Sequence, residues 1–377
     1  MSSPHPGQSH RRSGAVFRAV LGILAVSLAA LAGCSEEETP EGTIDGPGVP
    51  VKVMTRNLYL GADLTSLILT ATPEEIPARV GQFWSTVLAS EPAARMARLA
   101  EEIAAVRPDL VALQEVELYR TQSPSDFDLA TPAPPNASEV ALDFLQVLLG
   151  QLQALGVSYT AIENPLTDTE MPADVGGSRI DVRLTDREVI LVRPGLVAGK
   201  IAAKTFETHL PLRIGGERGV PVKLVRGLLG TEITGAGLPF FFVASHLEAG
   251  GPARLVQEAQ AGELVAALAA FAGTLVLAGD FNSPADNTGT TSHSQIAAVL
   301  RDAWAQARPA DPGFTCCTPL EAPVFTATAR SDLVFFRGAA RVVAADLSGT
   351  EAALKTATGR WPSDHAGVSV TFELPAN

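Results

Sequence analysis

The stretch that most constrains the fold is an apolar run ending in polar residues, Leu275-Val276-Leu277-Ala278-Gly279-Asp280-Phe281-Asn282. Its apolar residues favour a buried β-strand. Side chains alternate faces along an extended chain, so Asp280 and Asn282 should point the same way and Phe281 should point into the protein. Polar groups that converge at the end of a sheet strand commonly build an active site. Since Gly, Asp and Asn are also turn residues, the motif alone equally permits a plain turn.

Several other apolar segments of the chain also read as strands, and two of them lead into ionisable residues. Asp109 to Glu115 ends on an acid, and Phe240 to Ser245 runs into His246. Further strands are predicted at residues 51–55, 157–162, 188–192, 331–336 and 367–372. Residues 121–138 and 167–186 are polar and predict a surface insertion and a loop.

Amphipathic periodicity predicts the helices. Residues 95–106 place Met96, Leu99, Ile103 and Val106 on one face. Further helices are predicted at 141–155, at 254–271 and around 292–304, the second with Leu255, Ala259, Leu264 and Leu268 facing inward. The pattern indicates an α+β fold in which helices cover a strand-rich core.

The N-terminal region has the features of an export signal. Three arginines precede an apolar run from Ala19 to Leu31, which is too short to span a bilayer comfortably. The following Leu31-Ala32-Gly33-Cys34 resembles the lipobox of bacterial lipoproteins, which implies cleavage before Cys34 and lipidation of that cysteine. We therefore expect a signal peptide at 1–33, a disordered tether at 34–50 and a folded domain at 51–377, held at the bacterial cell surface or the periplasmic face of a membrane. The alternative is an uncleaved membrane anchor.

Charge and cysteine content bear on partners and on redox state. The full chain has a net charge of −13, and loss of residues 1–33 would remove three arginines and no acid, leaving −16. Such a charge disfavours nucleic acid as a partner unless metal ions or a local basic strip compensate. Besides Cys34, the chain contains the neighbouring pair Cys316-Cys317. In an exported protein this pair can be oxidised to a disulfide or can remain as two buried thiols.

Six short motifs occur in an order that resembles the endonuclease/exonuclease/phosphatase superfamily. This family includes pancreatic-type deoxyribonucleases, abasic-site endonucleases, neutral sphingomyelinases and inositol-polyphosphate phosphatases. The motifs are TRNL at 55–58, LVALQEV at 110–116, VASHL at 243–247, GDFN at 279–282, SDLVF at 331–335 and SDH at 363–365. The resemblance implies a four-layer α/β/β/α sandwich of two packed mixed β-sheets flanked by helices, with the active site at one end. It also implies that the cysteine pair, in a Gly-Phe-Thr-Cys-Cys stretch, is structural.

The resemblance also implies a role for each matching residue. Asn57, Glu115 and Asp364 would form a site for Mg²⁺ or Mn²⁺, to which hard oxygen ligands are suited. Asp280 would orient or deprotonate the attacking water, and Asn282 would hold a phosphate oxygen or the metal shell. His365 would contact the phosphate, and Asp332 would polarise that histidine. His246 would protonate or stabilise the leaving oxygen. Glu163 would pair with His246, because it lies in a Glu-Asn-Pro-Leu stretch similar to one in the deoxyribonucleases.

These observations predict a metal-dependent phosphoester hydrolase that acts as a monomer on small or lipid phosphodiesters. The competing predictions are an exported Mg²⁺-dependent endonuclease and a catalytically inactive binding lipoprotein. Lysine occurs only five times and forms no cluster, which favours the first prediction over a nuclease. Every catalytic position holds a competent residue, which disfavours the inactive protein.

Overall fold

The computed structural model describes residues 48–376, so the predicted signal peptide, Cys34 and most of the predicted tether lie outside the described residues. The first strand begins at Val49, slightly before the predicted domain start at residue 51, because Val49 and Pro50 already pair with Leu374 and Glu373. Within residues 48–376, none of the helices combines the length and the apolar character that a membrane span requires.

Two mixed sheets form the centre of the described domain. The first has the strand order β15-β16-β1-β2-β6-β3-β4, with β5 paired to β6, and the second has the order β13-β14-β12-β11-β10-β7. Strands of the first sheet are β1 (Val49–Asn57), β2 (Leu110–Gln114), β3 (Leu118–Gln122), β4 (Glu139–Asp143), β5 (Thr160–Val175), β6 (Ser178–Val192), β15 (Arg341–Ser348) and β16 (Gly367–Leu374). Strands of the second are β7 (Val197–Thr205), β10 (Gly227–Thr234), β11 (Phe240–His246), β12 (Leu275–Asp280), β13 (Arg301–Asp302) and β14 (Asp332–Arg337). A separate small hairpin joins β8 (Leu210–Ile214) to β9 (Val220–Leu224).

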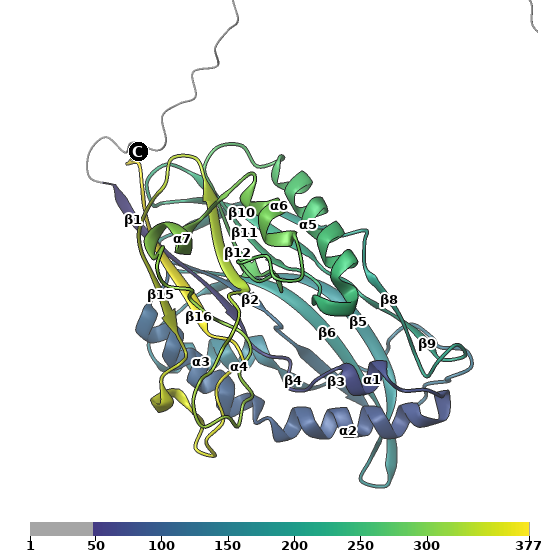
Figure 1. The fold of residues 1–377 in the computed structure, drawn as a ribbon. Coiled ribbons are helices and arrows are strands. Elements are labelled where there is room, and N and C mark those ends of the chain that lie inside the picture. Colours follow the sequence, from purple (N-terminus) through teal and green to yellow (C-terminus); the bar gives the residue numbers. More distant parts are fainter. Residues whose placement is uncertain (1–47, 377) are drawn as a thin grey trace, which may run out of the picture. The chain divides into compact units, whose positions relative to one another are not determined.

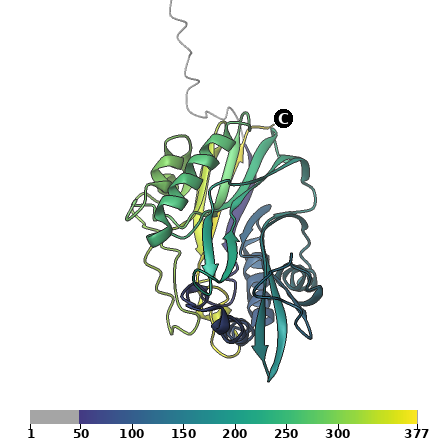
Figure 2. The same cartoon turned by 90° about the vertical axis from the view of Figure 1, so that its right-hand side faces the viewer.

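Helices cover the outer faces of both sheets, as Figures 1 and 2 show. On the first sheet lie α2 (Ile76–Ala89), α3 (Pro92–Val106) and α4 (Phe144–Ala154), with the short α1 (Thr65–Ile68) beside α2. On the second lie α5 (Arg254–Leu268) and α6 (Ser292–Ala297), while α7 (Ala303–Ala307) packs against β14 and β15. Three apolar layers result, one between the sheets and one beneath each set of helices. The predicted four-layer α/β/β/α sandwich is confirmed.

The two-residue period of the strands assigns each side chain to one of these layers. In β12, Val276 and Ala278 point into the space between the sheets, whereas Leu275 and Leu277 point toward α5 and α6. Leu110 and Ala112 of β2 likewise face the second sheet. Both faces of these strands are therefore buried, which explains why the sequence shows continuous apolar runs in place of alternation.

One predicted loop is wrong. Residues 167–186 do not form a loop but belong to β5 and β6, which make a long hairpin that turns at Gly176 and Gly177. Both glycines have positive φ angles, 59° and 83°, which other residues rarely adopt. The hairpin is held by polar cross-strand pairs, such as Arg183 with Asp168 at 2.6 Å, so it lacks the apolar signature of a strand.

The predicted helices are partly corrected. The helix predicted at 141–155 begins only at Phe144, because residues 139–143 form β4 and Asp143 caps the helix by accepting hydrogen bonds from the next backbone amides. The helix predicted around 292–304 is two short helices, α6 and α7. In α5, Leu264 and Leu268 are buried as expected, but Leu255 and Ala259 are exposed and Gln257 and Gln260 face inward.

Candidate active site

The candidate site lies where the layer between the sheets changes from apolar to polar. Asn57, His246 and Asp280 end β1, β11 and β12 on the face between the sheets, and Asp332 begins the antiparallel β14 on the same face. In the second sheet, Asp280 is registered opposite His246 on one side and Asp332 on the other. The strand period thus brings four polar side chains from two sheets into one buried group.

Asn57 connects the two sheets within this group. Its Nδ2 donates to Glu115 Oε1 at 3.0 Å and to Asp280 Oδ2 at 3.1 Å. Its Oδ1 accepts the backbone N–H of Tyr59, and Glu115 Oε2 accepts that of Leu60. Glu115 follows β2 with a φ of 54°, so its side chain departs from the strand alternation and turns toward Asn57.

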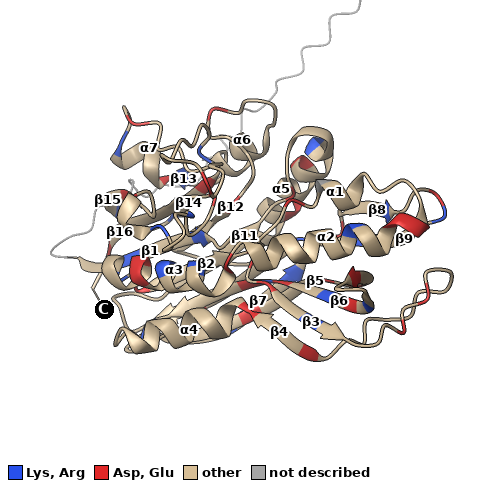
Figure 3. Ribbon diagram, turned by 90° about the horizontal axis from the view of Figure 1, so that it is seen from below, with Lys and Arg blue, Asp and Glu red and all other residues tan. Residues whose placement is uncertain are grey.

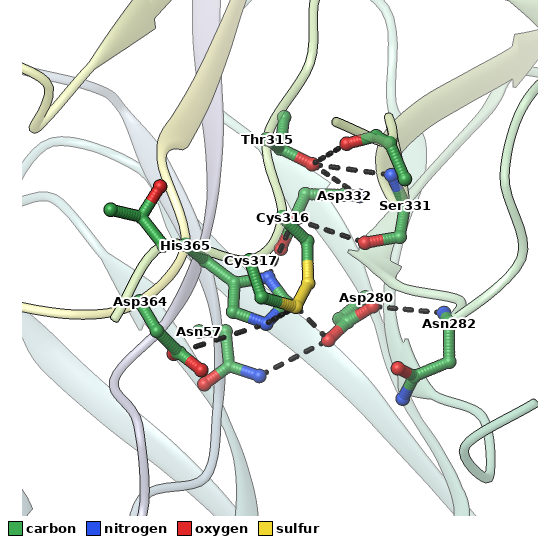
Figure 4. Close-up of a disulfide and its surroundings, with 12 residues drawn as sticks. Asn57, Asp280, Asn282, Thr315, Cys316, Cys317, Ser331, Asp332, Asp364 and His365 are labelled. Atoms are coloured by element: carbon green, nitrogen blue, oxygen red, sulfur yellow. Dashed lines mark hydrogen bonds and ion pairs between the residues drawn. A yellow bond between two sulfur atoms is a disulfide. The ribbon is translucent and has the colours of Figure 1, made fainter. Parts of the chain in front are cut away.

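His365 and Asp332 form the predicted histidine–carboxylate pair. The distance between His365 Nδ1 and Asp332 Oδ2 is 2.8 Å, and both residues are buried. Thr315 Oγ1 accepts the backbone N–H groups of Ser331 and Asp332, which fixes the start of β14 (Figure 4). Burial opposes the charged imidazole, but Asp332, Asp280 and Asp364 outweigh it and raise the pKa of His365 well above its usual value. Nε2 is left to face the site.

Asp280 lies at the centre of the group. Burial, together with the neighbouring charge of Asp332, raises the pKa of Asp280 to about 7. Its Oδ2 is 3.6 Å from His246 Nε2 and 3.7 Å from His365 Nδ1, and its Oδ1 accepts the backbone N–H of Asn282 at 2.9 Å. Asp280 is therefore within reach of both histidines and of Asn57, which places it where an attacking water could be held.

His246 has a different partner from the one expected. Arg226 Nη1 donates to His246 Nδ1 at 2.9 Å, and His246 Nε2 lies 3.1 Å from Asn282 Nδ2, which also donates to the backbone oxygen of Leu247. Burial, followed by the charge of Arg226, lowers the pKa of His246 well below its usual value. His246 is therefore neutral, which favours stabilisation of the leaving oxygen over its protonation by an imidazolium ion.

The predicted pairing of Glu163 with His246 is wrong. Glu163 forms an ion pair with Arg187 at 2.9 Å, and its side chain is 39% exposed. Arg187 also holds Asp143, the cap of α4. Glu163 therefore belongs to a partly exposed ion network of the first sheet and not to the buried group around His246.

Sequence reasoning missed the charged groups that surround and support the site. Arg226 faces buried acids, including Asp186 at 3.3 Å and Glu248 at 3.8 Å. Arg95 donates to the backbone oxygens of Leu58 and Pro362, and so ties the first motif to the last. The available signal was weak, because a single arginine next to a glycine or within a helix has many ordinary explanations.

Glutamines of α5 also support the site from behind. Gln257 Nε2 donates to the backbone oxygens of Asn282 and Glu248, at 2.7 and 2.8 Å. Gln260 accepts the backbone N–H of Glu248 at 2.8 Å. These bonds explain why two glutamines, and not Leu255 and Ala259, occupy the inward face of α5: the loops after β11 and β12 have buried backbone groups that need partners.

The carboxylates of the site fit a hard divalent cation. Burial raises the pKa values of Glu115 and Asp364, and in Glu115 the charge of Asp364 adds to the effect. Asp364 Oδ1 is 4.0 Å from His365 Nε2. Glu115 and Asp364 are partly buried carboxylates with little compensating positive charge, and such oxygen ligands suit divalent cations such as Mg²⁺ and Mn²⁺. Together with Asn57 they would hold such an ion. Asp280, Asp332 and His365 also lie within ligand distance of one another, but His365 Nδ1 is already bound to Asp332.

An apolar pocket adjoins the carboxylates. A small pocket of about 30 Å³ is lined by Glu115, Glu117, Asp186 and Arg226 together with leucines. It shares Leu64, Leu184 and Leu224 with a second pocket of about 60 Å³, whose other lining residues are almost all apolar. Two larger pockets, of about 400 and 430 Å³, meet at Phe314 and contain none of the predicted site residues. The pocket that continues from the site is therefore the apolar one of about 60 Å³, which adjoins the smaller pocket beside Glu115.

Cys316 and Cys317 form a disulfide that borders the site. The Sγ atom of Cys317 is 3.8 Å from His365 Nε2, and Figure 4 shows the sulfur atoms beside the histidine ring. Of the two possibilities left open by the sequence, the structure has the oxidised pair. The pair is not a remote structural link, because it lies against a predicted catalytic residue.

Comparison with known proteins agrees with this arrangement. The model of the endonuclease/exonuclease/phosphatase family matches residues 86–365, which is well over half of the chain, so the chain belongs to this family. Members of this family are typically metal-dependent phosphoester hydrolases. No curated protein matches the chain.

Solved structures show the same fold at low sequence identity. A family protein from Leptotrichia buccalis is 18% identical with a TM-score of 0.52, over 86% of this chain and 100% of that one. A humanized TDP2 from D. rerio is also 18% identical, with a TM-score of 0.51 over 86% of this chain and 99% of that one. At these identities the likeness establishes the fold alone.

Proposed function

We propose that this chain is a metal-dependent phosphodiesterase in which water attacks phosphorus. The observation that carries the proposal is the convergence of Asn57, Glu115, Asp280, Asp332 and His365 at one end of the layer between the sheets. A hydrolase of phosphoesters needs a held water, neutralised phosphate oxygens and assistance for the departing oxygen, and these residue types meet all three needs.

Each side chain has a task that its surroundings support. Asp280 accepts a proton from the attacking water, because its raised pKa makes it a suitable base near neutral pH. His365 donates from Nε2 to a phosphate oxygen while Asp332 holds its Nδ1. His246, kept neutral beside Arg226, and the amide Nδ2 of Asn282 next to it stabilise the leaving oxygen by hydrogen bonding. A bound Mg²⁺ or Mn²⁺ would neutralise charge on the non-bridging oxygens.

We propose small or lipid phosphodiesters as substrates. The apolar pocket lined by Leu64, Leu184 and Leu224 continues from Glu115 and suits a hydrocarbon group attached to the phosphate. Figure 3, which views the ribbon of Figure 1 from below, shows acidic and basic residues interspersed over the elements, without a continuous basic stretch. Together with the acidic net charge, this distribution argues against tracking of a nucleic-acid backbone. We further propose that the enzyme is monomeric and is anchored to a membrane through lipid on Cys34.

A substrate panel tests the proposal. The purified full-length chain in mild detergent is incubated with sphingomyelin, plasmid DNA and a chromogenic phosphodiester, each with Mg²⁺ or with EDTA. We expect Mg²⁺-dependent hydrolysis of the lipid and of the chromogenic ester. Preferential cleavage of DNA would identify the competing endonuclease, and no hydrolysis of any substrate would favour an inactive binding protein.

A matched variant tests the assignment of the metal ligand. Glu115→Gln should lower activity chiefly by weakening metal binding, so activity should recover in part at higher Mg²⁺. Glu163→Gln is the control, because Glu163 lies outside the buried group. An unchanged Mg²⁺ dependence in Glu115→Gln would contradict the assignment.

A further inference from the structure

The loop that carries the cysteine pair is tied to the SDH motif on both sides. The backbone N–H of Ala366 donates to Thr315 O at 2.9 Å, and that of Thr318 donates to Asp364 O at 2.8 Å. Cys316 forms an isolated bridge with Ala329. Cys316 and Cys317 are therefore held at a fixed place beside His365 by hydrogen bonds that do not involve either sulfur atom.

The donor atoms at this place form a group of soft ligands. The sulfur atoms of Cys316 and Cys317 and a ring nitrogen of His365 all lie within 4.8 Å of one another. Nδ1 of His365 is bound to Asp332 at 2.8 Å, so Nε2, next to Cys317, is the nitrogen that remains available. A histidine that binds a metal through one nitrogen usually donates its other N–H to a carboxylate, which is the arrangement here.

We propose that the reduced form of the protein binds one soft divalent cation, such as Zn²⁺ or Cd²⁺, through Cys316, Cys317 and His365. Two thiolates and an imidazole are a known ligand set for Zn²⁺, and they differ in kind from the oxygen ligands Glu115, Asn57 and Asp364. The two sites therefore select different cations, although they lie side by side.

Formation of the soft-cation site requires a dithiol or phosphine reductant. The S–S bond accepts two electrons and two protons and becomes two thiols. A dithiol supplies both and is oxidised to its disulfide, whereas a phosphine supplies the electrons and becomes its oxide with an oxygen atom from water, which also provides the two protons. The cation then displaces the two thiol protons, since thiolates are the ligands. If the proposed function is correct, the cation also occupies Nε2 of His365 and so prevents its contact with phosphate.

Absorption spectroscopy tests the site without any assay of activity. The full-length chain carrying Cys34→Ser has the pair as its only cysteines. After reduction with a phosphine and removal of the reductant without oxygen, it is titrated with Cd²⁺ in excess Mg²⁺. We expect ultraviolet cadmium–thiolate absorption that saturates at one Cd²⁺ per chain, and none in the oxidised chain. Absence of this absorption from the reduced chain would overturn the proposal.

Variants separate a three-ligand site from binding by the thiols alone. Cys317→Ser should abolish the absorption, and Asp332→Asn should weaken Cd²⁺ binding roughly 10- to 100-fold by releasing the imidazole. An unchanged Cd²⁺ affinity in His365→Ala would exclude histidine from the site and refute the proposal. The comparison of the reduced with the oxidised parent chain needs no further substitution, so it remains decisive if a variant folds poorly.

Inhibition provides the second readout, and it rests on the proposed function. Cd²⁺ or Zn²⁺ at the concentration that saturates the absorption should inhibit phosphodiester hydrolysis by the reduced chain and not by the oxidised chain. Cys317→Ser should resist this inhibition. Equal inhibition of Cys317→Ser would refute the link between the site and hydrolysis. If no substrate is hydrolysed at all, the proposed function fails, while the absorption titration still decides the cation site.

Discussion

Replacement of Asn57 by aspartate tests whether the buried carboxylates share a cation. The amide Nδ2 of Asn57 lies 3.0 Å from Glu115 Oε1 and 3.1 Å from Asp280 Oδ2. Asn57→Asp would put a third carboxylate oxygen within about 4 Å of both, where a like-charge pair costs about 4 kcal/mol at an effective dielectric constant of 20. Protonation sets an upper limit on this cost, because the new carboxyl group can stay neutral instead. Keeping it protonated at pH 7 requires its pKa to rise by roughly 3 units, which also costs about 4 kcal/mol.

The expected loss of stability without metal is therefore about 4 kcal/mol. At roughly 2 °C per kcal/mol for a domain of more than 150 residues, the Tm in EDTA should fall by about 8 °C. A bound cation favours the folded state, by about 2.7 kcal/mol at 100 times its Kd. The added carboxylate should bind Mg²⁺ more tightly than the amide does, so Mg²⁺ should stabilise the variant more than the parent. The loss in Tm should thus be much smaller in Mg²⁺ than in EDTA.

The assay is thermal unfolding of parent and variant, each in EDTA and over a series of Mg²⁺ concentrations. Asn164→Asp is the control, since Asn164 donates to the backbone oxygen of Leu228 and has no carboxylate partner in that bond. Its change in Tm should not depend on Mg²⁺. If Asn57→Asp loses the same stability with and without Mg²⁺, these oxygens do not hold the ion and the reasoning is refuted.

Three further predictions concern the anchor, the histidines and a buried ion pair. Cys34→Ala should release the protein from membranes with its specific activity intact, as cell fractionation would show; a variant that remains with the membrane fraction contradicts the lipid anchor. His365→Ala should lower kcat/KM at least ~10²-fold on every substrate, whereas His246→Ala should affect an ester with an alkoxide leaving group far more than a nitrophenyl ester, and equal losses would exclude a leaving-group role. Asp302 is the third case: burial opposes its charge, but His293 and Arg330 hold its pKa below the usual value. The ionised Asp302 thus stabilises the fold above its unfolded pKa of about 4, and this stabilisation is lost as pH falls through the lower folded pKa. Asp302→Asn should therefore lower the free energy of unfolding in urea by about 3 kcal/mol at pH 7 and by progressively less below pH 4.

The sequence allowed the prediction of those parts of the fold in which local pattern and burial agree. The runs around Val276 and Val111 are apolar on both faces because both faces are covered, and they were predicted as strands. The hairpin of β5 and β6 escaped prediction because its outer half gains stability from polar cross-strand pairs, which a single sequence does not distinguish from a loop.

The site was predictable where a residue directly extends a recognisable strand. Asp280 and His246 follow apolar runs, and Asp332 precedes one, at positions that the two-residue period directs between the sheets. Partnerships across long distances in the sequence were not predictable. Arg226 contacts His246 only because β10 and β11 pair in one particular register, with Gly227 opposite His246, and no local pattern encodes that register.

The hydrogen bond between Asn57 and Asp280 spans the gap between the two sheets, so the thickness of the sandwich sets the catalytic spacing. That thickness is determined by packed side chains well removed from the chemistry, such as Phe336 of β14 and Phe372 of β16, whose ring centroids lie 5.2 Å apart. Truncation of either ring would let the sheets settle closer together or leave a void, because protein interiors are close-packed. Turnover should therefore depend on the packing between the sheets. A substitution that changes the size of one central aromatic residue should need a compensating change in its partner to keep Asn57 and Asp280 in contact.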